Sequence, residues 1–282
     1  MDVVPLAEAG PLLDGLACEV LFSDLDGTLV GRGGSLLADL DGRPTLAAAE
    51  ALVAAHAAGL EVVLVSGRTR AQLHETGRLL GLRDAVAELG AVLVVEGRPV
   101  LEWGGAPKDL ADTPAGALER SGALAFLLDS FAGRLEPHTP WHLARHGTAL
   151  LRGQVDPAEA DARLAEAGFG WARLLDNGRL HGHRHLGPGQ THAYHLLPVG
   201  VTKATGAAAY LARRGIQAGR AAAIGDAPAD LELAATVGAM FVVANGVWAA
   251  DQTRAAGGPA IATPSGAGQG WAEAVRALIG GR

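Results

Sequence analysis

Two apolar runs that each end in polar residues and glycine most constrain the fold of this chain. One leads into Ser23-Asp24-Leu25-Asp26-Gly27-Thr28, and the other, Glu61-Val62-Val63-Leu64-Val65, leads into Ser66-Gly67-Arg68. Such continuous runs are typical of strands buried on both faces of a parallel sheet. A helix over about residues 45–58 is expected between them, capped by Thr45. Right-handed strand–helix–strand connections bring both polar ends to one sheet edge, where open α/β folds keep their ligand sites.

The two aspartates after the first run are separated by a single residue. On a strand, Asp24 and Asp26 would project to one side and Leu25 to the other. Two carboxylates that close repel each other unless a cation or a shared proton lies between them. A solvated acidic pair would explain an isolated Asp-x-Asp, but later segments of the chain favour a functional site.

The rest of the chain continues the parallel pattern and then interrupts it. Between about residues 104 and 195, short extended segments alternate with helical ones, which is typical of an α+β module. Asn177-Gly178 predicts a hairpin turn within that stretch. We therefore expect an α/β fold in which a Rossmann-like core with a parallel sheet, residues 1–103 and 196–282, carries an inserted α+β domain at residues 104–195.

The remaining predicted elements follow from periodicity and from turn residues. In the first part of the core they are a helix over 70–80 and a strand over 85–95. In the insertion they are helices over 112–131 and 157–167 and strands over 142–151, 172–175, 179–181 and 192–197. In the returning core they are helices over 202–214 and 270–278, a helix containing Trp248, and strands over 221–224 and 240–243.

Composition excludes several classes of protein. The chain has 23 Lys plus Arg against 30 Asp plus Glu, a net charge of −7, which argues against a nucleic-acid-binding surface. Cys18 is the single cysteine, so no internal disulfide forms. The first residues lack the basic start of a signal peptide, and no uninterrupted apolar stretch is long enough to span a membrane. We expect a cytoplasmic monomer or homodimer that binds a small phosphorylated substrate.

Four polar signals fall at predicted strand ends or helix starts, and together they suit phosphoryl transfer to an aspartate. A carboxylate can attack phosphorus while a second carboxylate acts as acid and base. Oxygen ligands alone match Mg²⁺. Hydroxyl and backbone N–H groups would bind phosphate oxygens, with a lysine as a fixed positive charge. The residues concerned are Asp24 with Asp26, Ser66, Lys203, and Asp226 with Asp230.

These four segments resemble the motifs of the haloacid dehalogenase (HAD) superfamily. Phe22-Ser23-Asp24-Leu25-Asp26-Gly27-Thr28-Leu29 is similar to the first motif, Ser66-Gly67-Arg68 to the second, Lys203 to the third and Gly225-Asp226-Ala227-Pro228-Ala229-Asp230 to the fourth. The insertion lies between the second and third motifs, as in members with a C2B cap. That Cof-like branch includes mannosyl-3-phosphoglycerate phosphatases and sucrose-phosphate phosphatases.

The resemblance implies a role for each motif residue. Asp24 would be the nucleophile, and Asp26 would protonate the leaving alcohol and then activate water. Mg²⁺ would be held by Asp24, the carbonyl oxygen of Asp26 and Asp226, with Asp230 as a ligand or a support. The phosphoryl group would be bound by Ser66 and Lys203 and by backbone amides after each strand, among them those of Leu25 and Gly67. The implied activity is that of a Mg²⁺-dependent phosphatase for a small metabolite such as a sugar phosphate or phosphorylated glycoside.

Four further residues are weaker candidates for substrate contacts, and each has an ordinary structural alternative. Arg68 either reaches the substrate or caps a helix at the surface. Arg145 and Arg152 lie on predicted strands of the insertion and are either anion ligands or exposed sheet residues. His183 belongs to a polar cluster that faces the substrate or simply faces solvent. Two departures from the family pattern are Ala229 and Leu89, at positions where many relatives carry Asn.

The resemblance leaves three other interpretations open. A phosphosugar mutase would share the nucleophile and the cap, but it would release no net phosphate. A weakly catalytic binding or regulatory protein would be consistent with Ala229 and Leu89. A phosphonatase-like hydrolase usually carries its cap between the first two motifs, where only 42 positions separate Asp24 from Ser66.

Overall fold

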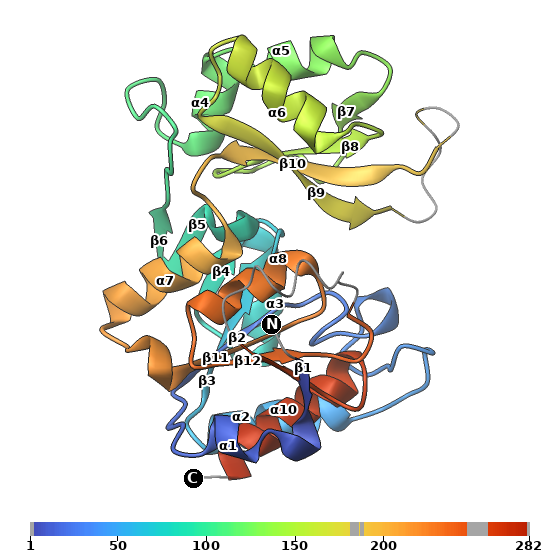
Figure 1. Ribbon diagram of the computed structural model, residues 1–282, viewed down its shortest axis with the longest axis vertical. Helices are drawn as coiled ribbons and strands as arrows, with labels where there is room; N and C mark the ends of the chain where they lie inside the picture. Colours follow the sequence, from blue (N-terminus) through green and yellow to red (C-terminus); the bar gives the residue numbers. More distant parts are fainter. Residues whose placement is uncertain (1–2, 181–185, 187–188, 247–258, 281–282) are drawn as a thin grey trace.

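The computed structural model of this chain describes residues 3–180, 186, 189–246 and 259–280, and it contains two sheets, one above the other in Figure 1. The large sheet has nine strands in the order β1-β13-β12-β11-β2-β3-β4-β5-β6. Neighbours from β1 through β4 pair in parallel, whereas β5 and β6 are antiparallel additions at one edge. The chain is therefore an α/β protein, as its sequence predicts.

The strands of the large sheet are short and almost wholly apolar. They are β1 (Val3–Pro5), β2 (Val20–Ser23), β3 (Glu61–Val65), β4 (Ala85–Ala87), β5 (Val92–Val95), β6 (Arg98–Leu101), β11 (Ala221–Gly225), β12 (Ala239–Val242) and β13 (Ala260–Ala262). On the central strand β2, Leu21 packs into one hydrophobic cluster and its neighbour Phe22 into another. Helices cover both faces of the sheet, so every side chain of β2 is buried.

The helices of the large part connect its parallel strands. The α-helices are α1 (Gly10–Leu13), α2 (Ala47–Ala57), α3 (Arg70–Leu80), α7 (Lys203–Arg214), α8 (Pro228–Leu231) and α10 (Ala267–Gly280), and the short 3-10 turns are η1 (Leu6–Glu8), η2 (Arg32–Gly34), η3 (Glu88–Gly90), η4 (Ala218–Arg220) and η5 (Glu232–Ala235). Thr69 and Thr202 begin α3 and α7 through capping boxes, which define both helix starts. The N-cap of α2 is Leu46 and not the predicted Thr45, although the Thr45 hydroxyl accepts the N–H of Ala47, the first residue of the helix, at 3.2 Å.

A second, smaller unit, here called the small module (residues 114–198), has its own sheet and its own core. Its strands β7 (Leu135–Pro137), β8 (Ala149–Gly153), β9 (Ala172–Arg179) and β10 (His192–Pro198) form an antiparallel sheet in the order β7-β8-β10-β9. Helices α4 (Pro114–Arg120), α5 (Ala123–Ser130) and α6 (Pro157–Glu166) lie on one face of that sheet, above it in Figure 1. Leu127, Leu151 and Leu196 belong to a separate hydrophobic cluster there.

The hairpin predicted at Asn177-Gly178 was wrong. Strand β9 continues through these residues to Arg179 and pairs with β10 on both sides of them. The register shifts between His192 and Tyr194, and Gly178 has φ +96, which is typical of a β-bulge. The side chain of Asp176 accepts the Gly178 N–H at 2.8 Å. Turn residues that normally close a hairpin here bend a strand instead.

Other predicted boundaries also needed correction. The strand predicted over 85–95 is two antiparallel strands, because residues 88–90 turn the chain with positive φ values. The helix predicted over 112–131 is two helices, separated at Gly122 (φ +87). Only the last residues of the strand predicted over 142–151 belong to a strand, which is β8 and begins at Ala149. Arg145 and His146 lie in the loop before it. The sequence did not predict the short strands β1, β6, β7 and β13. The helix predicted around Trp248 lies outside the described residues.

None of the helices described is both long enough and apolar enough to cross a membrane.

Candidate active site

The carboxyl ends of three adjacent strands meet at one edge of the large sheet. Strand β2 lies between β11 and β3 and is followed by Asp24, while β11 is followed by Asp226 and β3 by Ser66. Asp230 reaches the same place from α8. Residues far apart in the chain are therefore brought together by the parallel connections alone, as the sequence predicts.

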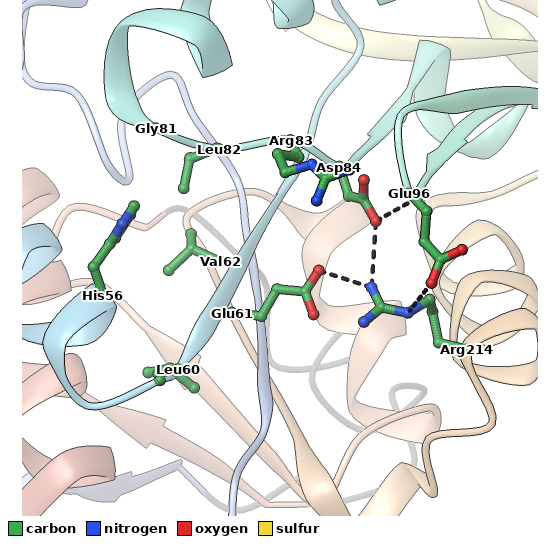
Figure 2. Close-up of a pocket in the computed structure, with 11 residues that line it drawn as sticks. His56, Leu60, Glu61, Val62, Gly81, Leu82, Arg83, Asp84, Glu96 and Arg214 are labelled. Carbon is green, nitrogen blue, oxygen red and sulfur yellow. Dashed lines mark hydrogen bonds and ion pairs between the residues drawn. The ribbon is translucent and has the colours of Figure 1, made fainter.

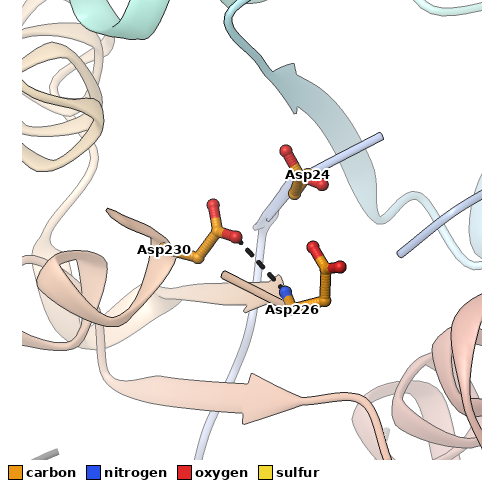
Figure 3. A group of neighbouring side chains, drawn as sticks. All are labelled: Asp24, Asp226 and Asp230. Atoms are coloured by element: carbon orange, nitrogen blue, oxygen red, sulfur yellow. Dashed lines mark hydrogen bonds between the residues drawn. The ribbon is translucent and has the colours of Figure 1, made fainter. Parts of the chain in front are cut away.

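Asp24, Asp226 and Asp230 form a compact group of carboxylates (Figure 3), each offering an oxygen within 4.8 Å of the others. Burial raises the pKa of Asp24 to about 7, and repulsion by Asp230 and Asp226 adds to that effect against the attraction of Lys203. Burial and Asp230 likewise raise the pKa of Asp226 to about 6. The three oxygens repel one another in a buried place, so they fit a divalent cation that prefers oxygen ligands.

Lys203 supplies a positive charge next to the three carboxylates. Its Nζ donates to Asp24 Oδ1 at 2.7 Å and to Asp230 Oδ1 at 2.6 Å. Burial lowers the pKa of Lys203, but Asp230 and Asp24 outweigh burial and raise it well above its ordinary value. One ammonium group faces three carboxylates, which leaves negative charge for a metal ion to neutralise.

Asp230 has both of its oxygens engaged within the protein. Oδ1 accepts from Lys203, and Oδ2 accepts the backbone N–H groups of Asp226 at 3.2 Å and Ala227 at 3.0 Å. The side chain is fully buried. These contacts orient the loop that carries Asp226, so Asp230 is arranged as a support for the cluster.

The side chains of Asn245 and Thr28 hold the loop that follows Asp26. Asn245 Nδ2 donates to the Gly27 carbonyl at 2.9 Å, and Asn245 Oδ1 accepts the Ala267 N–H at 2.7 Å. Thr28 Oγ1 donates to Asp226 Oδ1 at 3.3 Å. No local sequence pattern around Asn245 indicates that its side chain reaches the first motif.

Backbone N–H groups that point to no other described atom lie around the carboxylates. Among the described residues, the N–H groups of Leu25, Asp26 and Gly67 have no hydrogen-bond acceptor. The Ser66 hydroxyl accepts the N–H of Arg68 at 3.3 Å, so its own proton can be donated elsewhere. Donors without acceptors next to a cation site are suited to an anion with several oxygens.

Asp26 does not join the carboxylate cluster through its side chain. Its carboxylate accepts two hydrogen bonds from the Arg68 guanidinium, from Nε at 2.8 Å and from Nη2 at 2.6 Å. The side chain of Asp26 is 52% exposed and that of Arg68 is 36% exposed, so Asp26 is accessible to solvent. The prediction that its carbonyl oxygen binds a metal stays a prediction.

A cavity of about 340 Å³ lies between this edge of the sheet and the small module. Asp26, Ser66 and Gly67 line it from the large sheet. The other lining residues are Arg68 and Gln72 from the large part, and His138, Trp141, Arg145, Leu150, Asn177, Leu180, Ala193 and His195 from the small module. The small module therefore covers the predicted site and supplies most of the cavity wall.

His195 and Trp141 are the most distinctive groups in that wall. His195 is buried, and burial together with the charges of Arg145 and Lys203 lowers its pKa well below the ordinary value. Its Nδ1 lies 3.0 Å from Thr148 Oγ1. Trp141 is 52% exposed, so its ring is available to a ligand.

The weaker candidates had different outcomes. Arg145 lines the cavity, but its guanidinium is engaged by the protein, as described below. Arg152 pairs with Glu136 on the neighbouring strand β7 and is not among the cavity residues. His183 lies outside the described residues.

The two departures from the family pattern lie in different surroundings. Leu89 is buried, has φ +58 and donates its N–H to the Ser66 carbonyl at 3.1 Å, and it is not among the residues that line the cavity. Ala229 lines a separate, more apolar cavity of about 620 Å³ between α8 and strand β9. The polar side chain absent at Ala229 would have faced that second cavity.

Figure 2 shows a cavity at the opposite edge of the large sheet, where β3 and β4 begin. Arg214 Nη1 lies 2.8 Å from Glu61 and 3.3 Å from Asp84. The Tyr210 hydroxyl donates to Glu61 at 2.9 Å, and burial raises the pKa of that hydroxyl. These groups satisfy one another and fasten α7 to the sheet.

Comparisons with known proteins agree on one type of fold. A family model described as haloacid dehalogenase-like hydrolase matches residues 181–253. A phosphoglycolate phosphatase of Pyrobaculum aerophilum is 28% identical over 275 residues, which cover 94% of this chain and 98% of that protein. A solved Thermoplasma acidophilum protein superposes with a TM-score of 0.64 at 16% identity, covering 94% of this chain and 99% of its own.

Two further solved structures are similar over nearly their whole length. A HAD/COF-like hydrolase of Plasmodium vivax superposes with a TM-score of 0.62 at 16% identity and covers 97% of this chain and 98% of its own. The sucrose-phosphatase of Synechocystis, solved with sucrose and phosphate, has a TM-score of 0.62 at 16% identity and covers 92% and 97%. At these identities the structural matches show a shared fold.

Proposed function

We propose that the chain is a haloacid dehalogenase-like hydrolase of the Cof-like branch and a phosphoric monoester hydrolase, and that it releases phosphate from a small phosphorylated metabolite through an aspartyl-phosphate on Asp24. The observation that carries this proposal is the position of Asp24. Its carboxylate contacts the ammonium group of Lys203 and has an oxygen within 4.8 Å of an Asp226 carboxylate oxygen, next to N–H donors that have no acceptor among the described residues.

The first step is attack by Asp24 on phosphorus. A bond forms between a carboxylate oxygen of Asp24 and phosphorus, and the bond from phosphorus to the alcohol oxygen of the substrate breaks. The Ser66 hydroxyl and the N–H groups of Leu25 and Gly67 bind the phosphoryl oxygens, where negative charge is greatest in the transition state. Lys203 holds Asp24 in place and offsets its charge.

Asp26 moves the protons of both steps. It lines the cavity beside Ser66 and Gly67, where the leaving alcohol would lie. In the first step it donates a proton to that oxygen. In the second step it accepts a proton from water, whose oxygen attacks phosphorus and displaces Asp24. The products are the alcohol and inorganic phosphate.

Asp24, the carbonyl oxygen of Asp26 and Asp226 are the proposed Mg²⁺ ligands, with Asp230 in support. A bound Mg²⁺ would neutralise the charge of the phosphoryl group and of the carboxylates around it. The cluster of three oxygens within 4.8 Å, and the raised pKa values of Asp24 and Asp226, support this assignment.

The small module is proposed to act as a C2B cap that selects the substrate. Its residues cover the cavity and would exclude water during the first step. The wall combines an exposed tryptophan ring with the polar side chains of Gln72, His138 and Asn177, which suits a hydroxylated ligand such as a sugar phosphate or phosphorylated glycoside. The name of the Pyrobaculum relative makes phosphoglycolate the competing substrate to test.

Phosphate release from a substrate panel tests the proposal. Purified protein with Mg²⁺ should release phosphate from p-nitrophenyl phosphate and faster from at least one sugar phosphate, with phosphoglycolate in the same panel. Asp24→Asn should abolish release, whereas Asp14→Asn, an exposed aspartate, should have no effect. Residual turnover equal to wild type in Asp24→Asn would contradict the nucleophile. An isomerised sugar phosphate without released phosphate would indicate a mutase instead.

A further inference from the structure

In the loop that follows β3, residues 66–68, all three backbone carbonyl groups accept hydrogen bonds. Leu89 donates its N–H to the Ser66 carbonyl at 3.1 Å, and Glu88 donates its N–H to the Arg68 carbonyl at 3.0 Å. Both donors belong to the neighbouring turn η3. The middle carbonyl, that of Gly67, accepts from Arg145 Nη2 at 3.0 Å. That third contact comes from the small module, so the two parts of the protein share the task of holding this loop.

Arg145 has few donors left for a ligand. Nε donates to the Trp141 carbonyl at 3.2 Å, and Nη1 donates to Thr148 Oγ1 at 3.0 Å and faces Glu88 at 3.8 Å. With Nη2 on Gly67, the guanidinium bonds to three backbone or hydroxyl oxygens of the protein and pairs with one carboxylate. Its side chain is 4% exposed. Arg145 is therefore arranged to hold protein groups rather than a substrate anion.

Glu88 fixes the loop that carries Arg145. Its carboxylate is fully buried and accepts three consecutive backbone N–H groups of the small module, from His146, Gly147 and Thr148, each at 3.0 Å. A buried carboxylate needs such donors and a nearby cation, because burial without partners is costly. Glu88 thus joins η3 of the large part to the loop before β8 and places the guanidinium of Arg145 over Gly67.

The hydrogen bond from Arg145 to the Gly67 carbonyl also fixes the direction of the Arg68 N–H. The carbonyl of Gly67 and the N–H of Arg68 belong to the same planar peptide and point in opposite directions. Arg145 holds the carbonyl, and the Arg68 N–H consequently points to Ser66 Oγ at 3.3 Å. That hydrogen bond occupies one lone pair of the hydroxyl and leaves its proton to be donated to a phosphoryl oxygen.

We propose that Arg145, held by Glu88, is a positioning residue that orients the Gly67–Arg68 peptide and thereby the phosphoryl-binding hydroxyl of Ser66. The phosphoryl site is complete only when the small module is docked. This inference rests on the proposed function, in which Ser66 binds the transferring phosphoryl group.

The alternative is that Glu88 and Arg145 only stabilise the interface between the two parts. The two roles differ in what a paired neutral substitution restores. Arg145→Met leaves Glu88 as an unpaired buried carboxylate, and Glu88→Gln leaves Arg145 as an unpaired buried cation. The double variant Glu88→Gln/Arg145→Met removes both charges, so it should recover much of the thermal stability that the single variants lose. It does not restore a donor to the Gly67 carbonyl.

The experiment measures Tm, kcat and KM for both single variants and the double variant, with Arg163→Met as the matched control. Arg163 lies in the same module and pairs with Glu159 away from the cavity. We expect the double variant to regain most of the wild-type Tm while its kcat remains about tenfold or more below that of the wild type. The loss of kcat should be smaller than the roughly 10²- to 10³-fold loss that follows deletion of a direct oxyanion donor. Arg163→Met should keep wild-type kcat.

Recovery of kcat in parallel with Tm would overturn the positioning role and leave an interface role. Inorganic phosphate binding, measured calorimetrically with Mg²⁺, separates this result from a failure of the proposed function. If wild-type protein hydrolyses nothing in the panel yet binds phosphate more tightly than the double variant does, the positioning of the loop stands and the proposed reaction fails. Equal phosphate affinity in the two proteins would overturn the inference.

Discussion

Lys203 Nζ lies 2.7 Å from Asp24 Oδ1, although 179 positions of the chain separate the two residues. The same ammonium group is 2.6 Å from Asp230, and all three side chains are buried. Helix α7 begins at Lys203 through the Thr202 cap, and β2 ends directly before Asp24. A helix start and a strand end therefore define the centre of the proposed site.

Removal of the lysine charge should affect stability as well as activity. Lys203→Met leaves Asp24 and Asp230 buried without their cation, which typically costs ~3–5 kcal/mol. Urea unfolding should show that loss in protein without added metal, and phosphate release should fall to background. Lys108→Met, at an exposed lysine, is the control and should change neither quantity. Wild-type stability in Lys203→Met would mean that the ion pairs add nothing to folding.

Metal binding should be visible without any substrate. Mg²⁺ should raise the Tm of the wild type and not that of Asp226→Asn, and EDTA should abolish phosphate release. Because the pKa of Asp24 is raised to about 7 and that of Asp226 to about 6, protons compete with the metal at these carboxylates. Mg²⁺ affinity should therefore increase from pH 5.5 to pH 8. An affinity that is independent of pH would contradict these ligands.

The first motif should not tolerate a methyl group at its glycine. Gly27 has φ +88, and a Cβ there would lie 2.4 Å from Asp226 Oδ2. Gly27→Ala should displace the Asp226 carboxylate and weaken Mg²⁺ binding, measured by titration calorimetry. Gly97→Ala is the matched control, since Gly97 has φ +78 but nothing within 4 Å of its Cβ position. Both variants lose roughly 1 kcal/mol from the backbone conformation, and only Gly27→Ala should lose the metal. Equal metal binding in the two would place Asp226 outside the metal site.

His195 should make stability fall as the pH falls. Its pKa is lowered well below 6.5 in the folded protein because it is buried near Arg145 and Lys203. The unfolded chain takes up a proton below pH ~6.5 that the folded protein does not, so His195 destabilises the fold as the pH drops through that value, by up to ~1.4 kcal/mol per unit.

Urea unfolding of the wild type and of His195→Gln between pH 5 and pH 7.5 measures this contribution. The difference between the two pH dependences isolates His195, because the raised pKa values of Asp24 and Asp226 act in the opposite direction and are common to both proteins. Parallel pH dependences would contradict a neutral buried His195.

The elements around the site follow from the sequence because their signals are local. The helix predicted over 70–80 and the strand over 61–65 match α3 and β3, since a capping threonine, a stop glycine and a continuous apolar run mark their limits. The prediction failed where a local signal had two structural uses. Asn177-Gly178 bends β9 as a bulge, because pairing with β10 on both sides of the glycine outweighs the turn preference.

The sequence by itself determined which residues gather at the site. Polar residues after buried strands converge because parallel strands end at a common edge, and this holds for Asp24, Ser66 and Asp226. Only the tertiary structure decided how the groups are held. The pairing of Asp26 with Arg68 depends on how the loops after β2 and β3 pack together, and the contact of Arg145 with the Gly67 carbonyl depends on how the small module lies against the large sheet. Contacts of that kind arise from the packing of distant segments, which no local pattern of residues specifies.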